Sequence, residues 1–356
     1  MLKAEKYSAS LIKLYYIFLI KFGLSKKKLM RVLLQLIVAF AIISQTTISC
    51  QSETKKKNEL SIGIQTYSFR TMEDQSPLAI LEYIKQTGIK QVELMGNHAE
   101  PFAGAPESPI NDPSKMAVLI KQYRKEPLTE DEKVIAAEVA AMRETYNAEV
   151  AAWLKNVDFK KFEELKSLYA QAGISIYAFK PSVFRKNNSD DDIRYGMSAA
   201  KALGASHITL EHPEDDQHTA RLAKIAEEEG MLIGYHGHEQ QTPTLWDTAM
   251  SQSDANRMNL DFGHYIAAEN ENPLEIIKSK HHKIVSMHLK DRQKKSNGGG
   301  NLVWGEGDTP IAEVIKLIKE NGYDFPVTIE LEYDIPEGSD AVQEVKRCLA
   351  YVENIQ

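Results

Sequence analysis

The stretch LIGYHGHEQQTPTLWDTAMSQSDANRMNLDFGH, residues 232–264, contains the pattern that decides the fold. It holds two short apolar runs, Leu232–His236 and Met258–Asp261, and each run ends in imidazole or carboxylate side chains. Nearly continuous apolar runs are typical of strands that are buried on both faces of a parallel sheet. We therefore predict two parallel strands here, with polar groups at their carboxyl ends.

The same kind of run recurs from Leu60 onward, separated by longer amphipathic stretches, and this alternation indicates βα units. The runs assigned as strands are Leu60–Tyr67, Gln91–Leu94, Ser175–Phe179, His207–Glu211, Leu232–His236, Met258–Asp261, Ile284–His288 and Val327–Glu332. Stretches with helical spacing between them are Pro77–Gly88, Asp191–Leu203, Thr219–Gly230 and Ile311–Gly322. Eight strands with intervening helices predict a closed (β/α)8 TIM barrel. A doubly wound open sheet is the alternative, and no glycine-rich dinucleotide or P-loop motif supports it.

The connection between the second and third predicted strands is unusually long. It contains the loop Pro101–Pro113 and the stretch Asp131–Leu154, whose apolar residues have helical spacing. We predict an extended helical insertion between strands 2 and 3. It is either an extra helix packed on the barrel or a lid over the barrel mouth.

The first fifty residues differ from the rest of the chain. A basic cluster at residues 26–31 precedes the apolar run Val32–Ile43, and a small and polar stretch then leads to Cys50. This is the layout of a secretory signal, and the run is shorter than the about 20 apolar residues of a membrane span. Translation starts at either Met1 or Met30.

The residues around Cys50 predict a lipid anchor. Thr47-Ile48-Ser49-Cys50 resembles a lipobox, although Thr47 departs from the usual Leu or Val. We therefore expect an extracytoplasmic protein that is held at the membrane by lipid on Cys50 alone. The alternative is a cleaved signal peptide with an incidental cysteine. The expected organisation is a signal segment over 1–50, a tether over 51–59 and a barrel domain over 60–356.

Charge and cysteine content exclude some classes of protein. The net charge is −7 and the body of the chain has no basic stripe, which argues against nucleic acid as a partner. Cys348 is the only other cysteine, so a chain lipidated at Cys50 has no internal disulfide. Assembly into a homo-oligomer is compatible with the sequence.

Five successive predicted strands end in residue types that bind metals. Active-site residues of TIM barrels lie at these carboxyl ends. The ends hold Glu211, then His236 and His238, then Asp261 and His264, then His288 and Lys290, and finally Glu330 and Glu332. Buried carboxylates that lack a partner are costly, and a bound cation would offset their mutual repulsion. Carboxylates with an imidazole suit Mn²⁺, Zn²⁺, Co²⁺ or Mg²⁺, and the oxygen majority favours the harder metals, with Mn²⁺ first.

The strand ends and a glycine-rich loop resemble a known family. The matching stretches are Ile208–Pro213, Gly234–His238, Leu260–His264, Val285–Asp291, Gly305–Asp308 and Ile329–Glu332. Together they resemble the xylose isomerase-like TIM barrel superfamily, in its sugar phosphate isomerase/epimerase branch. The resemblance implies one divalent metal held by Glu211, Asp261, His288 and Glu330. Glu332 competes with Glu330, because residues two apart on a strand point to the same side, but Glu330 directly follows the apolar run.

The resemblance also implies roles for residues around the metal. His236, His238 and His264 fall at positions that the family uses near substrate and metal, either as orienting groups or as catalytic ones. Lys290 either contacts substrate oxygens or forms an ion pair. The loop after the seventh strand would close near the substrate, with Glu306 at the substrate and with Trp304 either stacking on a sugar ring or anchoring the loop.

The family chemistry is proton removal from a carbon next to a carbonyl, with a metal as Lewis acid. The resemblance assigns Glu211 and Glu330 as the catalytic pair, assisted by His238, and implies a sugar isomerase or epimerase. Export argues for a free sugar or a keto-glycoside rather than a sugar phosphate. A lyase or hydratase acting on keto-glycosides is the first alternative, and a non-catalytic carbohydrate-binding lipoprotein is the second. An endonuclease is disfavoured by the acidic charge.

Overall fold

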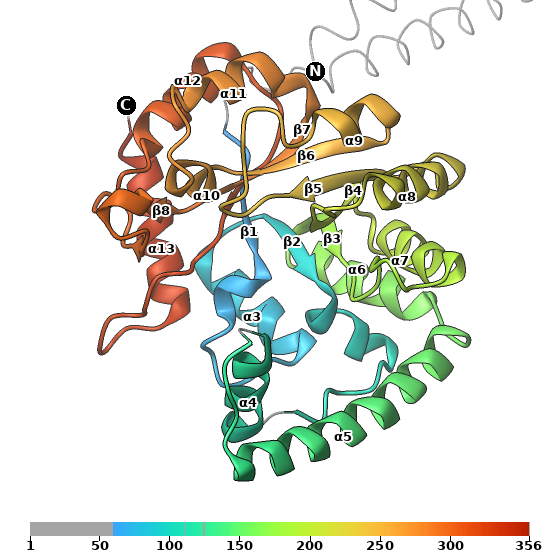
Figure 1. The fold of residues 1–356 in the computed structure, drawn as a ribbon. Coiled ribbons are helices and arrows are strands. Elements are labelled where there is room, and N and C mark those ends of the chain that lie inside the picture. Colours follow the sequence, from blue (N-terminus) through green and yellow to red (C-terminus); the bar gives the residue numbers. More distant parts are fainter. Residues whose placement is uncertain (1–59, 111, 124, 356) are drawn as a thin grey trace, which may run out of the picture. The chain divides into compact units, whose positions relative to one another are not determined.

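The computed structural model describes residues 60–110, 112–123 and 125–355. Cys50 and the predicted signal segment and tether therefore lie outside the described residues. Eight parallel strands close into a barrel in the order β1-β10-β7-β6-β5-β4-β3-β2. Figure 1 shows the strands with helices around them. The strands are β1 (Ile62–Gln65), β2 (Gln91–Met95), β3 (Ser175–Lys180), β4 (His207–Glu211), β5 (Leu232–His236), β6 (Asn256–Asp261), β7 (Ile284–Leu289) and β10 (Val327–Ile329). The predicted (β/α)8 barrel is confirmed.

The first and last strands are shorter than predicted. The chain leaves β1 at Gln65 because Thr66–Phe69 forms a 3-10 helix, and the Gln65 side chain accepts a hydrogen bond from the Tyr67 backbone N–H. Strand β10 ends at Ile329, so Glu330 is the first residue beyond it. A small hairpin of β8 (Asp291–Arg292) and β9 (Asn301–Leu302) follows β7, which the sequence analysis did not predict.

Helices surround the strands. They are α3 (Pro77–Thr87), α6 (Lys160–Gln171), α7 (Asp190–Leu203), α8 (Asp216–Glu229), α9 (Asp247–Gln252), α10 (Phe262–Ala267), α11 (Leu274–Lys280), α12 (Ile311–Asn321) and α13 (Ala341–Glu353). Local signals set their ends. Ser189 and Asp192 form a capping box at the start of α7, and Gly204 ends this helix in the left-handed conformation with φ 78°. The apolar faces of the helices pack on the strands in one core.

Two further helices, α4 (Pro113–Tyr123) and α5 (Glu130–Leu154), lie between β2 and β3 ahead of α6. Helix α5 starts at a capping box of Thr129 and Glu132, and it buries little beyond Val139. Near its end, the Trp153 indole N–H donates to the Ala103 carbonyl at 3.0 Å, and the Trp153 ring packs edge-on against Tyr195. The far part of α5 extends outward from the barrel beside α4 (Figure 1). Among the described residues, no helix combines the length and apolarity needed to cross a membrane.

Candidate active site

Four buried side chains meet at the carboxyl end of the barrel. They are His236 from β5, Asp261 from β6, His288 from β7 and Glu330 directly after β10. Each offers one nitrogen or oxygen atom, and these four atoms all lie within 4.8 Å of one another. All four side chains are almost fully buried. The structure thus brings three of the predicted ligands together and adds His236 to them, while Glu211 lies outside this group.

A buried hydrogen-bond chain fixes the tautomer of His236. Asn259 donates from Nδ2 to the Ser286 hydroxyl at 2.7 Å, so its Oδ1 faces His236 Nδ1, also at 2.7 Å, and accepts the proton there. Because Nδ1 carries the hydrogen, the lone pair lies on Nε2, which is 3.8 Å from Asp261 Oδ2. Burial lowers the pKa of His236 to about 4, so the ring is neutral. His236 therefore presents a metal-binding nitrogen to the centre of the group.

His288 is held from both sides by carboxylates. Its Nε2 lies 2.7 Å from Glu93 Oε2, and its Nδ1 lies 3.0 Å from Glu330 Oε2. Burial alone would lower the pKa of His288, but the charges of Glu93 and Glu330 outweigh burial and raise it to about 10. Since Nδ1 faces the four-residue group and Nε2 faces away, a bound metal would replace the proton on Nδ1 while Nε2–H donates to Glu93.

Glu93 contacts His288 and is a candidate site residue that the sequence did not point to. It lies on β2 with no exposed surface, and it also accepts a hydrogen bond from the Thr209 hydroxyl at 2.7 Å. A carboxylate that orients a metal-binding histidine is a recurrent feature of metal sites. The available signal was a single charged residue inside the apolar run Gln91–Leu94.

Replacing Glu93 tests this arrangement. We expect Glu93→Ala to weaken divalent-metal affinity by about 10- to 100-fold, because His288 loses the acceptor that fixes its ring. Glu93→Gln keeps a hydrogen-bonding group and should lose less. Titration of Mn²⁺ or Zn²⁺ into the apoprotein by calorimetry measures the effect, and Glu107→Ala, on an exposed loop, is the control. Unchanged affinity in Glu93→Ala would show that Glu93 has no part in positioning the ligand.

Lys290 lies among the carboxylates. Its ammonium is 2.9 Å from Asp261 Oδ2 and 2.6 Å from one oxygen each of Glu330 and Glu332. Of the two roles considered for Lys290, the structure shows the ion pair. Gly263 makes room for this side chain, since a Cβ at residue 263 would lie 2.3 Å from the Lys290 Cγ. Glu332 binds Lys290 and stands outside the four-residue group, whereas Glu330 belongs to it.

The four residues fit a divalent cation. Asp261 Oδ2 is buried and receives no hydrogen bond of normal geometry from the described residues, although the Lys290 ammonium is close. The carboxylates of Glu93, Asp261, Glu330 and Glu332 outnumber the single lysine, so the site has excess negative charge. Two imidazoles and two carboxylates are a donor set that suits Mn²⁺, Zn²⁺ or Co²⁺. The identity of the metal remains a prediction.

Glu211 lies at the open mouth of the barrel instead. Its carboxylate accepts from Lys180 Nζ at 2.6 Å and lies 2.9 Å from His238 Nε2, and its side chain is 54% exposed. Partial burial would raise the pKa of Glu211, but the hydrogen bond from His238 and the charge of Lys180 hold it well below its usual range. Glu211 is thus an ionised carboxylate that faces the mouth beside the four-residue group.

His264 is a neutral hydrogen-bond donor. The Arg292 guanidinium donates to its Nδ1 at 2.5 Å, and because a guanidinium can only donate, the ring proton lies on Nε2. Nε2 is 3.9 Å from Asp261 Oδ2 and 4.0 Å from Glu332 Oε2. Burial, with the charge of Lys290, lowers the pKa of His264 to about 2.

This tautomer decides between two possible metal groups. His236, His238 and His264 also have ring nitrogens within 4.8 Å of one another, and the last two rings stack with centroids 4.6 Å apart. A nitrogen that carries a hydrogen has no lone pair for a metal. The hydrogen on His264 Nε2 therefore argues against a metal site of three histidines. The group of His236, Asp261, His288 and Glu330 is favoured instead.

The loop after β9 is anchored by Asp291. This carboxylate accepts from the backbone N–H groups of Gly305 at 2.7 Å, Gly307 at 3.0 Å and Thr309 at 3.2 Å. Trp304 is buried and packs edge-on against Tyr351 of α13, which agrees with the anchoring role. Glu306 is exposed on the loop, and no contact places it at the four-residue group.

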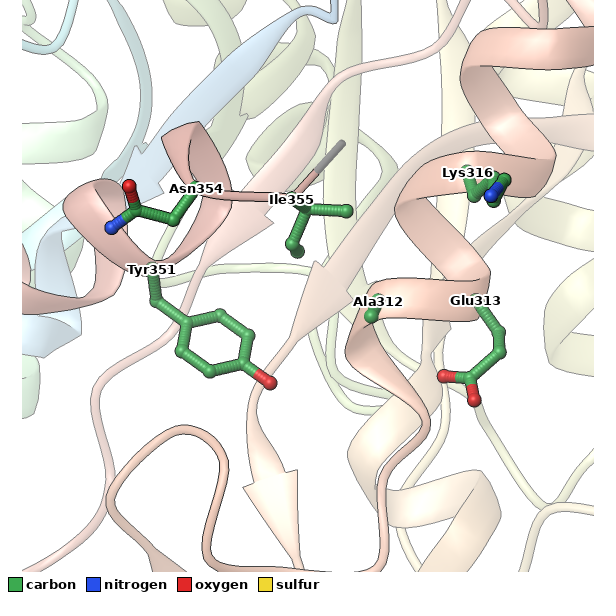
Figure 2. A pocket seen from close by; sticks show the side chains of 6 residues that line it. All are labelled: Ala312, Glu313, Lys316, Tyr351, Asn354 and Ile355. Carbon is green, nitrogen blue, oxygen red and sulfur yellow. The ribbon is translucent and has the colours of Figure 1, made fainter.

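A cavity of about 490 Å³ lies on the outside of the barrel between α12 and α13, as Figure 2 shows. Its lining is Ala312, Glu313, Lys316, Tyr351, Asn354 and Ile355. None of these residues belongs to the site at the barrel mouth. Among the described residues, the groups that could hold a metal therefore lie at the carboxyl ends of the strands and not in this cavity.

The fold and site define a (β/α)8-barrel protein with a buried histidine–carboxylate group that can hold a metal. The sequence profile of the xylose isomerase-like TIM barrel family matches residues 81–351, and the chain belongs to this family. The solved structures that it resembles include sugar phosphate isomerases/epimerases. Proteins that this chain is similar to include epimerases and dehydratases, so their names do not point to one reaction.

Individual relatives differ in their reactions. The chain is 33% identical over 134 residues to an inosose dehydratase of Clostridium botulinum, and the match covers 32% of this chain and 45% of that protein. The probable 3-DHS dehydratase AsbF of Bacillus anthracis superposes with a TM-score of 0.56 at 13% identity, over 83% of this chain and 100% of its own. The 3-keto-D-glucoside 4-epimerase YcjR of E. coli gives a TM-score of 0.52 at 13% identity, over 83% of this chain and 99% of its own. At these identities the two structures show the fold alone.

Proposed function

We propose that this protein is a metal-dependent lyase that removes a proton next to a carbonyl of a keto sugar or keto-glycoside and expels the oxygen on the adjacent carbon. His236, Asp261, His288 and Glu330 would hold the cation. When bound, the cation supplies Lewis-acid polarisation of the substrate carbonyl, which makes the neighbouring carbon-bound proton more acidic. The observation that carries the proposal is an ionised carboxylate, Glu211, at the mouth beside this group and outside it.

Glu211 is the proton acceptor in this proposal. Glu330 is less suited to that role, because it is buried within the group that would bind the cation, whereas Glu211 is half exposed at the mouth. Glu211 takes the proton from the carbon next to the carbonyl, and the carbon–oxygen bond on the following carbon breaks. The same carboxylate then delivers this proton to the departing oxygen. Glu211 ends unchanged, and the products are an unsaturated carbonyl compound and water or an alcohol.

His264 assists as a fixed donor. Its Nε2–H lies near Asp261 and Glu332, and the guanidinium of Arg292 holds its ring. A neutral imidazole with a fixed N–H can stabilise negative charge that develops on a substrate oxygen without transferring its proton. Elimination in this form needs one mobile proton carrier, and Glu211 meets that need.

The second candidate is epimerisation or isomerisation, which returns the proton to carbon and uses carboxylates on opposite faces of the sugar. Glu211 at the mouth and Glu330 in the buried group are two carboxylates that could form this pair. Elimination is preferred because Glu330 would be held by the cation and because the inosose dehydratase relative is named for an elimination.

The experiment is incubation of the Mn²⁺-loaded protein in deuterium oxide with a panel of free ketoses and 3-keto-glycosides, followed by NMR. Formation of an unsaturated sugar with release of its leaving group is the expected result. Deuterium in an isomeric product would overturn elimination in favour of epimerisation or isomerisation. Saturable binding without any exchange or product would overturn the enzyme proposal in favour of a carbohydrate-binding protein.

We further propose that the protein acts outside the cytoplasmic membrane, anchored by lipid on Cys50. The support is the order of the basic cluster, the apolar run and the cysteine in the sequence. Mass spectrometry of the mature N-terminus is expected to show an acylated Cys50 as the first residue. Cys50→Ser should shift the protein from the membrane fraction to the soluble fraction. An intact Met1 or Met30 on soluble wild-type protein would contradict the anchor.

A further inference from the structure

A second cavity of about 710 Å³ adjoins the site at the barrel mouth. Three loops line it at the carboxyl ends of β2, β3 and β4, namely Met95–Asn97, Lys180–Lys186 and Leu210–Asp215, together with His218 of α8. Lys180 and Glu211 belong to this lining and also form the ion pair at the mouth of the barrel. The cavity therefore begins where the proposed proton acceptor stands.

One wall of the cavity is held by a buried carboxylate. Glu100, which is 5% exposed, accepts from the Ser182 backbone N–H at 3.1 Å and from the Ser182 hydroxyl at 3.0 Å. The Tyr195 hydroxyl donates to the same oxygen at 3.1 Å. These bonds tie the loop after β3 to the segment after β2 and to α7, so this wall is formed in advance of ligand binding.

The same loop contains a strained residue. Phe184 has φ 92°, a backbone conformation that a bulky side chain rarely adopts. Its carbonyl accepts from His218 Nε2 at 2.8 Å, and its ring packs over Gly196, where a Cβ would lie 2.4 Å from the ring. Strain of this kind persists where the surroundings fix it, and it is concentrated at ligand sites.

The charges in the cavity are balanced. Its basic side chains are Lys180, Arg185 and Lys186, and its acidic side chains are Glu211, Glu214 and Asp215. Two of these pairs are in contact, Lys180 with Glu211 at 2.6 Å and Lys186 with Asp215 at 2.5 Å. A cavity without excess positive charge is poorly suited to a phosphate, whereas paired donors and acceptors suit hydroxyl groups, which both donate and accept.

We propose that this cavity is the subsite for the leaving group of a glycoside, and that its occupant is a second, uncharged sugar ring. This inference rests on the proposed function. The reacting keto sugar would lie at His236, Asp261, His288 and Glu330, and the second ring would lie between the loops after β2, β3 and β4. The volume lies within the range of about 300–1,000 Å³ of ligand pockets, and none of the four metal-group residues lines this cavity.

The position of Glu211 agrees with this arrangement. Glu211 lines the cavity, and in the strand register it pairs with His236 of the metal group. The glycosidic bond would lie at this junction. In a 3-keto-glycoside the proton leaves carbon 2 and the glycosidic oxygen leaves carbon 1. Glu211 can take the first and protonate the second, which releases the second sugar as an alcohol and leaves a 2-hydroxy-3-keto-glycal. The substrate class is therefore a keto disaccharide in preference to a free ketose or a sugar phosphate.

The test compares methyl 3-keto-glucoside with a 3-keto disaccharide of the same reacting ring. Wild-type protein is expected to have a kcat/KM at least about 10-fold higher for the disaccharide, equivalent to about 1.4 kcal/mol. Asn97, which is exposed and lines the cavity, allows the space to be reduced by Asn97→Trp. This variant should lose the preference and retain the kcat/KM for the methyl glycoside. Asn97→Ala should behave as wild type.

Equal kcat/KM values for both substrates in wild type, or an equal loss for both in Asn97→Trp, would overturn the subsite. Failure of the proposed function has a different signature, because then neither substrate reacts. In that case calorimetry with the unoxidised disaccharide tests the cavity alone. Saturable binding to wild type that is lost in Asn97→Trp supports the subsite. Absence of binding to wild type, or equal binding to both proteins, overturns it.

Discussion

His236→Ala is expected to lose the bound divalent cation, while Glu211→Ala retains it. The lone pair of His236 faces Asp261, because Asn259 holds the opposite ring nitrogen. Glu211 is instead paired with Lys180 and His238. Changes to groups around a metal ligand typically weaken metal binding 10- to 100-fold, so we expect loss of the ligand itself to exceed about 100-fold.

Metal analysis after equilibration with Mn²⁺ and gel filtration measures this difference. Thermal unfolding gives a second readout, because a ligand present at 100 times its Kd stabilises the folded state by about 2.7 kcal/mol. Chelation should therefore lower the Tm of wild type and Glu211→Ala and leave that of His236→Ala unchanged. His238→Ala is the matched control for loss of a nearby imidazole and should keep the metal. Loss of metal from Glu211→Ala with retention in His236→Ala would restore the ligand set that the family resemblance implied.

Glu211→Gln is expected to lower kcat by about 10²–10⁴-fold with the metal content unchanged, which is the usual contribution of a general acid–base group. The amide keeps the size of the side chain but cannot accept the substrate proton. Glu107→Gln, on an exposed loop outside both the metal group and the cavity, should retain activity. Proton exchange in deuterium oxide and product formation are the measurements.

Full activity in Glu211→Gln would exclude Glu211 as the acceptor. Glu330→Gln tests whether Glu330 is a metal ligand or the catalytic base. We expect this variant to lose activity together with metal, because Glu330 is a ligand. Loss of activity in Glu330→Gln with metal fully retained would identify Glu330 as the base and would favour the two-carboxylate epimerisation mechanism.

The buried site also shows how the fold tolerates so many charged groups. Glu93, Asp261, Glu330 and Glu332 all contact His288 or Lys290, so none of these carboxylates stands without a cation. Removal of one partner from a buried ion pair typically costs about 3–5 kcal/mol. Lys290 is therefore as important for folding as for any contact with substrate, and its substitution is a poor test of catalysis.

The sequence by itself determined the barrel and the end of the barrel at which the chemistry lies. Short apolar runs separated by amphipathic stretches are a local property, and the run Leu232–His236 forms the strand that it predicts. The carboxyl ends of parallel strands share one edge, so the sequence predicts that Glu211, Asp261, His288 and Glu330 lie together, and the last three of these do.

Only the tertiary structure decided which side chains converge there. Glu211 and His236 are neighbours in the register of β4 and β5, but Lys180 on β3 pairs with Glu211 at the mouth, and Asn259 on β6 directs His236 inward. Glu93 reaches His288 across the barrel, 195 residues away in sequence. Which side chains converge depends on their rotamers and on hydrogen-bond partners from other strands. A local pattern of residues carries no information about these partners, because they come together only when the barrel closes.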